Sequence, residues 1–242
     1  MEVQTFIDNY REAFGPAAEL PLVFGYSNQP WSEPQKVNGC FFKCFTEVRS
    51  GIPRTLDAGT IGCGGGKLYT GFSGMPERVP HFVSLKEKYK QTPEMVIAYI
   101  EQLDMPLAGK PYLNFCRVDQ TDTFDDKEGI LFFASPDILS GLTTWAYFDN
   151  NDEMAVSSIF GSGCSAVVSQ AVTENRRQGR RTFIGGFDPS VRPYLCANEL
   201  TFTIPIHRFR EMYNTMRASC LYDTHAWKKI CERIDNNAAN EI

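Results

Sequence analysis

The sequence has no excess of basic residues and no long apolar run. Its 24 Lys and Arg are outnumbered by 29 Asp and Glu, and the formal net charge is −5 at pH 7. A general nucleic-acid-binding protein is expected to be basic, so this class is excluded. No apolar run approaches the roughly 20 residues of a membrane-spanning helix. We therefore expect neither nucleic acid nor a membrane as a partner.

The N-terminal residues lack the pattern of a secretory signal. Acidic Glu2 and Asp8 stand where a signal peptide has basic and then apolar residues. We therefore expect a cytoplasmic protein. In that compartment the eight cysteines are expected to be free, metal-bound or catalytic rather than paired in disulfides.

Several familiar site motifs are also missing. No Cys-x₂-Cys pair occurs, and no two of the three histidines have helical metal-binding spacing. Residues 62–67 lack the spacing and the Ser or Thr of a P-loop, and residues 161–167 do not form a Gly-x-Ser-x-Gly turn. A P-loop nucleotidase and a serine hydrolase are therefore excluded.

What the sequence does have is an alternation of strand-like and helix-like segments. We expect helices over residues 2–14, 40–48, 92–103, 135–147, 164–177 and 206–216, and strands over 21–26, 55–61, 112–118, 129–134, 154–159, 181–185 and 200–204. Such alternation favours parallel βαβ units. The sequence predicts a single α/β domain over residues 1–235, with a mixed, largely parallel sheet flanked by helices. Residues 236–242 are expected to form a frayed C-terminal tail.

Residues 160–168 are the most informative stretch. They predict the end of a strand, a glycine turn and a helix that begins at Cys164. A thiol at a helix start is shifted toward thiolate, so Cys164 is the candidate nucleophile. The hydroxyls of Ser162 and Ser165 and the amide of Gly163 are candidate ligand-binding groups. The alternative is a small residue packed under the sheet.

A second candidate is the glycine-rich segment 62–67. Gly62, Gly64 and Gly65 would let the backbone approach a ligand closely, and Lys67 would pair with its phosphate or carboxylate. A flexible loop without function is the alternative. Further along the chain, Arg192 is a candidate carboxylate clamp, unless it forms a structural ion pair with Asp188.

A third candidate is a metal centre. Cys40 and Cys44 lie four residues apart and share one face of a predicted helix. Together with Cys63 and Cys164 they would supply four sulfur ligands for zinc or an iron–sulfur cluster. The alternative is that Cys40 and Cys44 are small apolar side chains of a core helix.

Three segments resemble a known family. They are residues 61–66 (IGCGGG), 163–168 (GCSAVV), and 187–192 (FDPSVR), which leads to 199–205 (ELTFTIP). In this order they resemble the uncharacterised ArCR-type family, domain of unknown function 169. The chain departs from the expected pattern in having Phe41 after Cys40 and Gly64 after Cys63, where that family leads us to expect proline. The resemblance implies a cytoplasmic α/β protein and no established activity.

Three hypotheses follow. The first is a metal or iron–sulfur site where the Cys63 and Cys164 segments meet, with Cys40 or Cys44 as further ligands. The second is a thiol enzyme with Cys164 as nucleophile and Lys67 or Arg192 as the anchor of an anionic substrate. The third is a non-catalytic protein that binds a small anionic molecule. The oligomeric state is not indicated by the sequence.

Overall fold

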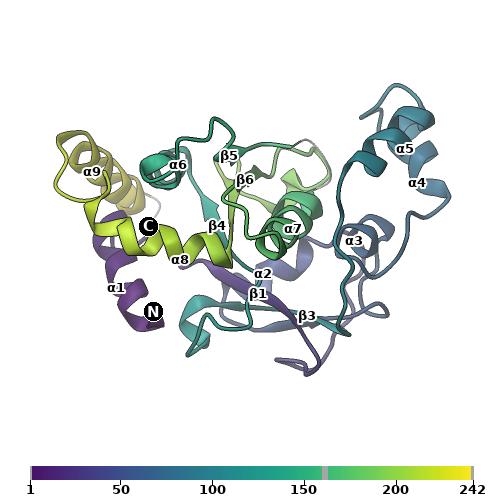
Figure 1. Cartoon of the computed structure of the whole chain (residues 1–242), viewed down its shortest axis with the longest axis horizontal. Coiled ribbons are helices and arrows are strands. Elements are labelled where there is room, and N and C mark those ends of the chain that lie inside the picture. The colour runs from purple at the N-terminus through teal and green to yellow at the C-terminus, as the bar shows by residue number, and fades with distance from the viewer. Residues whose placement is uncertain (1, 160–162, 241–242) are drawn as a thin grey trace.

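The computed structural model of the chain describes residues 2–159 and 163–240. Its described strands form a seven-stranded sheet in the order β2-β3-β1-β4-β7-β6-β5, with helices packed around it (Figure 1). The strands are β1 (Leu22–Ser27), β2 (Arg54–Leu56), β3 (Tyr112–Arg117), β4 (Gly129–Ala134), β5 (Val156–Ser157), β6 (Thr182–Gly185) and β7 (Leu200–Pro205). The α-helices are α1 (Val3–Phe14), α2 (Lys43–Arg49), α3 (Gly64–Tyr69), α4 (Arg78–His81), α5 (Pro93–Gln102), α6 (Pro136–Phe148), α7 (Gln170–Arg176), α8 (Ile206–Thr215) and α9 (His225–Asn240). Two π-helical turns, η1 (Phe82–Lys86) and η3 (Ser165–Ser169), and three 3₁₀ turns, η2 (Val118–Gln120), η4 (Arg192–Tyr194) and η5 (Met216–Ala218), complete the described elements.

The expected α/β architecture is confirmed, but the expectation of a largely parallel sheet is wrong. Among the described strands only β5 and β6 pair in parallel, and the other neighbours are antiparallel. The helical crossovers from β4 to β5 and from β5 to β6 are present. The sheet is antiparallel there because β7 inserts between β4 and β6 and runs against both.

The central strands are apolar on both faces, and their side chains alternate between two cores. Leu131 and Phe133 of β4 belong to a core beneath α2 and α7, which we call the α2/α7 core. Ile130 and Phe132 belong to the opposite core beneath α1, α6 and α8, the α1/α8 core. Because both faces are covered, β4 reads as a continuous hydrophobic run rather than as an alternating one.

Residues 78–102, which we call the α4–α5 lobe, project from one end of the molecule (Figure 1). Its last helix, α5, begins as the sequence predicts: the Thr92 side chain accepts a hydrogen bond from the Met95 N–H at 3.3 Å, and Pro93 occupies the first turn. The α5 face with Val96 and Ile100 is buried against the α2/α7 core. The rest of the lobe was not expected from the sequence.

At the other end of the chain, α9 continues to Asn240, and fraying of residues 236–242 stays a prediction. None of the helices in the described parts of the chain is both long and apolar enough to cross a bilayer.

A buried arginine connects α8 to the end of α6. The Arg208 side chain is fully buried, and its guanidinium donates to Ala146 O at 3.0 Å, to Asp149 Oδ2 at 3.0 Å and to Glu211 Oε2 at 2.8 Å. Its hydrogen bonds are the main cause that lowers the pKa of Asp149.

We expect Arg208→Met to lower the free energy of unfolding at pH 7 by about 2 kcal/mol, because it removes the charged hydrogen-bond donor of Asp149 and leaves this carboxylate with the partly exposed Arg180, at 3.3 Å. A carboxyl whose pKa is lowered by folding stabilises the fold above its unfolded pKa, and this contribution is lost as the pH falls through the folded value. The difference between variant and wild type should therefore shrink below about pH 4. Urea unfolding of variant and wild type at pH 7 and below about pH 4 measures this difference in the free energy of unfolding.

The matched control is Arg177→Met, which removes an exposed guanidinium paired with the exposed Asp104 and should leave stability nearly unchanged. Equal losses in the two variants, or a loss in Arg208→Met that does not depend on pH, would contradict this account of Arg208.

Candidate functional site

A cavity of about 400 Å³ lies between the α4–α5 lobe on one side and α3 and the loop after β6 on the other. Segments far apart in the sequence line it, and three of the lining residues are cysteines. We call it the thiol cavity; its lining residues are Cys40, Cys63, Gly65, Gly66, Tyr69, Val79, Phe82, Val83, Glu87, Tyr89, Lys90, Val96, Tyr99, Ile100, Cys164, Asp188, Ser190 and Val191. Most of the lining surface is apolar.

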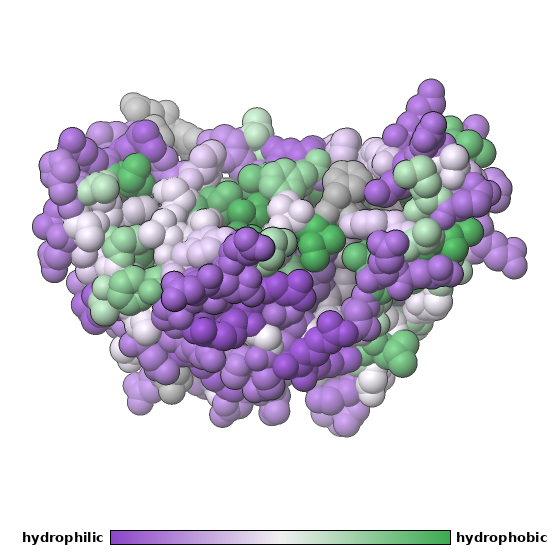
Figure 2. Space-filling view, turned by 45° about the horizontal axis from the view of Figure 1, so that its top comes forward, coloured by the Kyte–Doolittle hydropathy of each residue, from purple (hydrophilic) through white to green (hydrophobic). Residues whose placement is uncertain are grey.

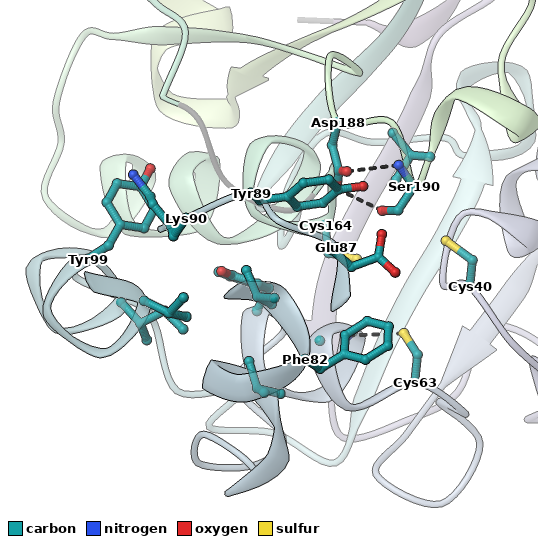
Figure 3. A pocket seen from close by; sticks show the side chains of 18 residues that line it. Cys40, Cys63, Phe82, Glu87, Tyr89, Lys90, Tyr99, Cys164, Asp188 and Ser190 are labelled. Carbon is teal, nitrogen blue, oxygen red and sulfur yellow. Dashed lines mark hydrogen bonds between the residues drawn. The ribbon is translucent and has the colours of Figure 1, made fainter. Parts of the chain in front are cut away.

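The two ends of the thiol cavity differ in chemistry. Cys40 and Cys63 lie at one end with Glu87 near them, and Lys90 and Tyr99 lie at the other (Figure 3). The Lys90 ammonium is 4.3 Å from the centre of the Tyr99 ring, which is a cation–π distance. The Tyr99 hydroxyl is buried and has no hydrogen-bond partner in the described structure, so it is a polar group that a ligand would satisfy.

Apolar surface continues from the thiol cavity to the outside of the lobe. Phe82 lines the cavity yet is 52% exposed, and Leu85 and Met95 of the same lobe are also exposed. Figure 2 shows apolar surface at the lobe end of the molecule, among hydrophilic side chains. The apolar lining of the thiol cavity is therefore continuous with exposed apolar side chains of the lobe.

Asp188 holds the walls of the thiol cavity together. Its carboxylate is 3% exposed and accepts hydrogen bonds from Gly163 N at 3.2 Å and from Ser190 N and Oγ, both at 2.9 Å. The Tyr89 phenol approaches from the lobe: burial, the charges of Asp188 and Glu87 and hydrogen bonds to both raise the pKa of Tyr89 to about 12. One carboxylate thus contacts the loop after β6, the start of the helix that carries Cys164, and the lobe.

The glycine-rich segment forms a helix instead of the expected loop. Cys63 is the N-cap of α3, and its Sγ accepts a hydrogen bond from Gly66 N at 3.1 Å. The amides of Gly62 and Lys67 donate to the carbonyls of Val37 and Cys63. These three amides are therefore used within the protein, and binding of an anion by the backbone at Gly64 and Gly65 stays a prediction.

The three cavity cysteines differ in their surroundings. Cys164 is 4% exposed and belongs to the α2/α7 core as well as to the cavity wall. Cys40 and Cys63 are half-buried. For Cys40, burial is the main cause that raises the pKa of the thiol, and the nearby Cys63 and Asp188 act in the same direction.

Other predicted site residues lie elsewhere. Cys44 is buried in the α2/α7 core, where burial raises the pKa of its thiol strongly. Lys67 does not line the thiol cavity. Arg192 donates to the carbonyls of Gly186, Cys196, Ala197 and Glu199, so it stabilises its own loop and makes no ion pair with Asp188.

Of the small residues predicted to bind a ligand that the structure describes, only Gly65 lines the thiol cavity. Gly62 precedes the N-cap residue Cys63, Gly64 is the first residue of α3, and Gly163 is buried. The Ser165 hydroxyl accepts hydrogen bonds from Ser169 and Gln170 and faces a separate, smaller cavity. Ser162 lies outside the described residues.

In residues 2–159 and 163–240, no three His, Cys, Asp or Glu side chains are grouped so that they could hold a metal ion. The sequence reasoning missed Glu87, Tyr89, Lys90 and Tyr99. Tyr99 lies within the predicted helix 92–103, which was assigned no function, and the other three lie in a segment for which no helix or strand was predicted.

Comparison with known proteins identifies the family of this chain. It belongs to the family described as uncharacterised ArCR, domain of unknown function 169, whose pattern matches residues 18–215. That range includes all the lining residues of the thiol cavity. No curated protein and no solved structure matches the chain.

Two adjacent glycines of α3 provide a test of the cavity wall. A Cβ added at Gly66 would lie 2.8 Å from Cys63 Sγ and 2.9 Å from Ile61 Cγ2, whereas one added at Gly65 would meet no atom within 4 Å. We expect Gly65→Ala to raise the free energy of unfolding by up to about 1 kcal/mol, because alanine is the better helix former. Gly66→Ala should lower it by about 1 kcal/mol or more, because the added methyl group overpacks the site.

Urea unfolding of the two variants measures the difference. If Gly65→Ala destabilises the protein as much as Gly66→Ala, the wall at Gly65 is not open and the cavity is not shaped as described.

Proposed function

We propose that this protein binds a small, largely apolar molecule in the thiol cavity and acts on it through a cysteine thiol. The observation that carries the proposal is the convergence of Cys40, Cys63 and Cys164, from three distant segments, on one apolar cavity. A volume of about 400 Å³ lies within the range of small-molecule sites, which are mostly apolar with a few polar groups that orient the ligand.

Cys63 is the thiol best suited to react. Its side chain is half-buried, so a ligand in the cavity can reach the sulfur, and Gly66 N–H donates to that sulfur at 3.1 Å. This hydrogen bond holds the sulfur in one position at the cavity wall. Cys164, which the sequence favoured, is nearly buried in the core and would form the floor of the site.

The opposite end of the cavity would orient the ligand. The Tyr99 hydroxyl and the Lys90 ammonium are hydrogen-bond donors there. We therefore propose a ligand with an electrophilic carbon at one end, an apolar middle and a hydrogen-bond acceptor at the other end. In the reaction the Cys63 thiolate adds to one carbon of an activated C=C bond: the S–C bond forms, the π bond breaks, and the other carbon takes up a proton from solvent.

The proposal predicts that Cys63 reacts faster with maleimides as their N-alkyl chain lengthens. Each buried methylene contributes about 0.8 kcal/mol, so the four methylenes added from ethyl to hexyl should raise the Cys63 rate by about 200-fold when all are buried, and by at least about tenfold when two are. The exposed Cys196 lies outside the cavity and should show no such trend. Brief labelling followed by peptide mass spectrometry gives both rates within one sample.

A matched pair of variants tests whether the cavity is responsible. Gly65→Leu places a side chain into the cavity and should abolish the chain-length trend at Cys63. Gly74 is equally open to an added Cβ but does not line the cavity, so Gly74→Leu should preserve it. A Cys63 rate that follows the Cys196 rate for every maleimide would refute the proposal.

A second candidate is a soft metal or iron–sulfur centre held by Cys40, Cys63 and Cys164, and it is favoured by the presence of three thiols around one cavity. Each sulfur would have to lie about 2.3 Å from a bound zinc ion, so the side chains would turn inward on binding. Cys44 would take no part, because it lies in the core.

Metal analysis of anaerobically purified protein decides this candidate. A metal centre predicts about one ion or cluster per chain, lost in Cys63→Ser and kept in Cys44→Ser. Protein without stoichiometric metal, or equal metal content in the two variants, rules the centre out.

A further inference from the structure

The backbone holds the segments that lead to Cys40 and Cys63 side by side. Val37 and Ile61 form an isolated parallel β-bridge. Val37 N donates to Thr60 O at 2.9 Å, and Gly62 N donates to Val37 O at 3.0 Å. The two segments therefore run in the same direction at the separation of neighbouring strands, about 4.8 Å.

The glycines next to the cysteines bring the two segments into contact. Gly39 directly precedes Cys40 and Gly62 directly precedes Cys63, and a Cβ at Gly62 would lie 3.4 Å from Gly39 N. A Cβ at Gly62 would also lie only 2.4 Å from Val37 O. Only glycine permits this approach of the two backbones.

A second set of contacts agrees with this arrangement. A Cβ at Gly66 would lie 2.8 Å from Cys63 Sγ and 3.3 Å from the Cβ of Phe41, the residue after Cys40. The sulfur of Cys63 and the backbone of the Cys40 segment thus meet at the same turn of α3. Both thiols lie at the same end of the thiol cavity (Figure 3).

We propose that Cys40 and Cys63 are a redox-active dithiol pair, which a hydroperoxide oxidises to an intramolecular disulfide. A disulfide needs Cα atoms about 4.4–6.8 Å apart, a separation that residues on adjacent segments reach. As a way to regulate the thiol cavity, the inference rests on the proposed function. Disulfide formation itself rests on the geometry of the two segments alone.

The surroundings of the two thiols give them different roles. Cys63 receives the Gly66 N–H and is the thiol that attacks the peroxide. Burial raises the pKa of the Cys40 thiol, and we assign Cys40 the second step, as the resolving cysteine.

Each step balances. The Cys63 thiolate attacks one peroxide oxygen, the O–O bond breaks, and hydroxide leaves and takes up a proton to become water. The sulfur becomes a sulfenic acid. Cys40 then gives up its proton and attacks this sulfur, the S–S bond forms and a second water leaves. The two thiols lose two electrons to one hydrogen peroxide, and an added dithiol reduces the disulfide again.

The experiment treats the full-length reduced protein with one equivalent of hydrogen peroxide and measures its intact mass. We expect most of the protein to lose two hydrogen atoms, an unreduced peptide map to link Cys40 to Cys63, and dithiothreitol to restore the original mass. In the oxidised protein, labelling of Cys63 by hexylmaleimide should fall by more than about tenfold.

Three variants assign the roles, and circular dichroism checks that each is folded. Cys40→Ser should lose the disulfide and accumulate a sulfenic acid on Cys63, which dimedone traps. Cys44→Ser and Cys164→Ser should keep the Cys40–Cys63 disulfide, although Cys44 lies on the helix that follows Cys40 and Cys164 lines the same cavity.

A disulfide that maps to another pair, or a mass loss that Cys40→Ser leaves unchanged, overturns the inference. The proposed ligand site fails separately, when the reduced protein shows no dependence of Cys63 labelling on alkyl chain length. A protein that forms the disulfide but lacks that dependence would keep the dithiol pair and lose its role at a ligand site.

Discussion

The arrangement of the candidate site depends on one buried carboxylate. Asp188 is 3% exposed, and a carboxylate in such a place needs hydrogen-bond donors to offset its lost hydration. Two donors come from Ser190 in its own turn and one from Gly163, the residue before Cys164. Because Tyr89 also contacts Asp188 from the lobe, the position of Cys164 and the closeness of the lobe are set by the same group.

The parts of the fold that follow from local rules could be predicted from the sequence. The helix 3–14 shows a clear apolar face, α5 has its Thr-Pro start, and β4 is a short run of large apolar residues. The sheet order could not be predicted. The strand at residues 200–205 inserts between β4 and β6 instead of adding to an edge of the sheet. Its own sequence does not indicate this, because strand pairing depends on contacts that are distant in the sequence.

The residues of the candidate site also form two groups, those that the sequence indicates and those that it does not. Cys63 and Cys164 stand out in the sequence because each is next to glycine, and both line the thiol cavity. The cavity-lining residues of the α4–α5 lobe show no comparable sequence pattern. Residues 82–86 form a π-helical turn and Phe82 and Leu85 stay exposed, so the segment lacks the 3.6-residue apolar period by which helices are recognised. Lys67 does not line the cavity and Arg192 donates to carbonyls of its own loop, because charge and sequence position do not determine which way a long side chain points.

The cysteines show why residue type alone could not assign chemistry. Cys40 and Cys44 are four residues apart, but α2 begins only at Lys43, so Cys40 is not on the helix and the two thiols do not share its face. Cys44 enters the core, where a thiolate would be poorly solvated and the thiol is inert. Cys40 remains at the cavity because Gly39, with φ +87°, turns the chain before it. The left-handed conformation of Gly39 therefore places the Cys40 thiol at the cavity wall, whereas the Cys44 thiol lies in the core. The proposed pairing of Cys40 with Cys63 depends on that turn and on the Val37–Ile61 bridge, not on the helical spacing.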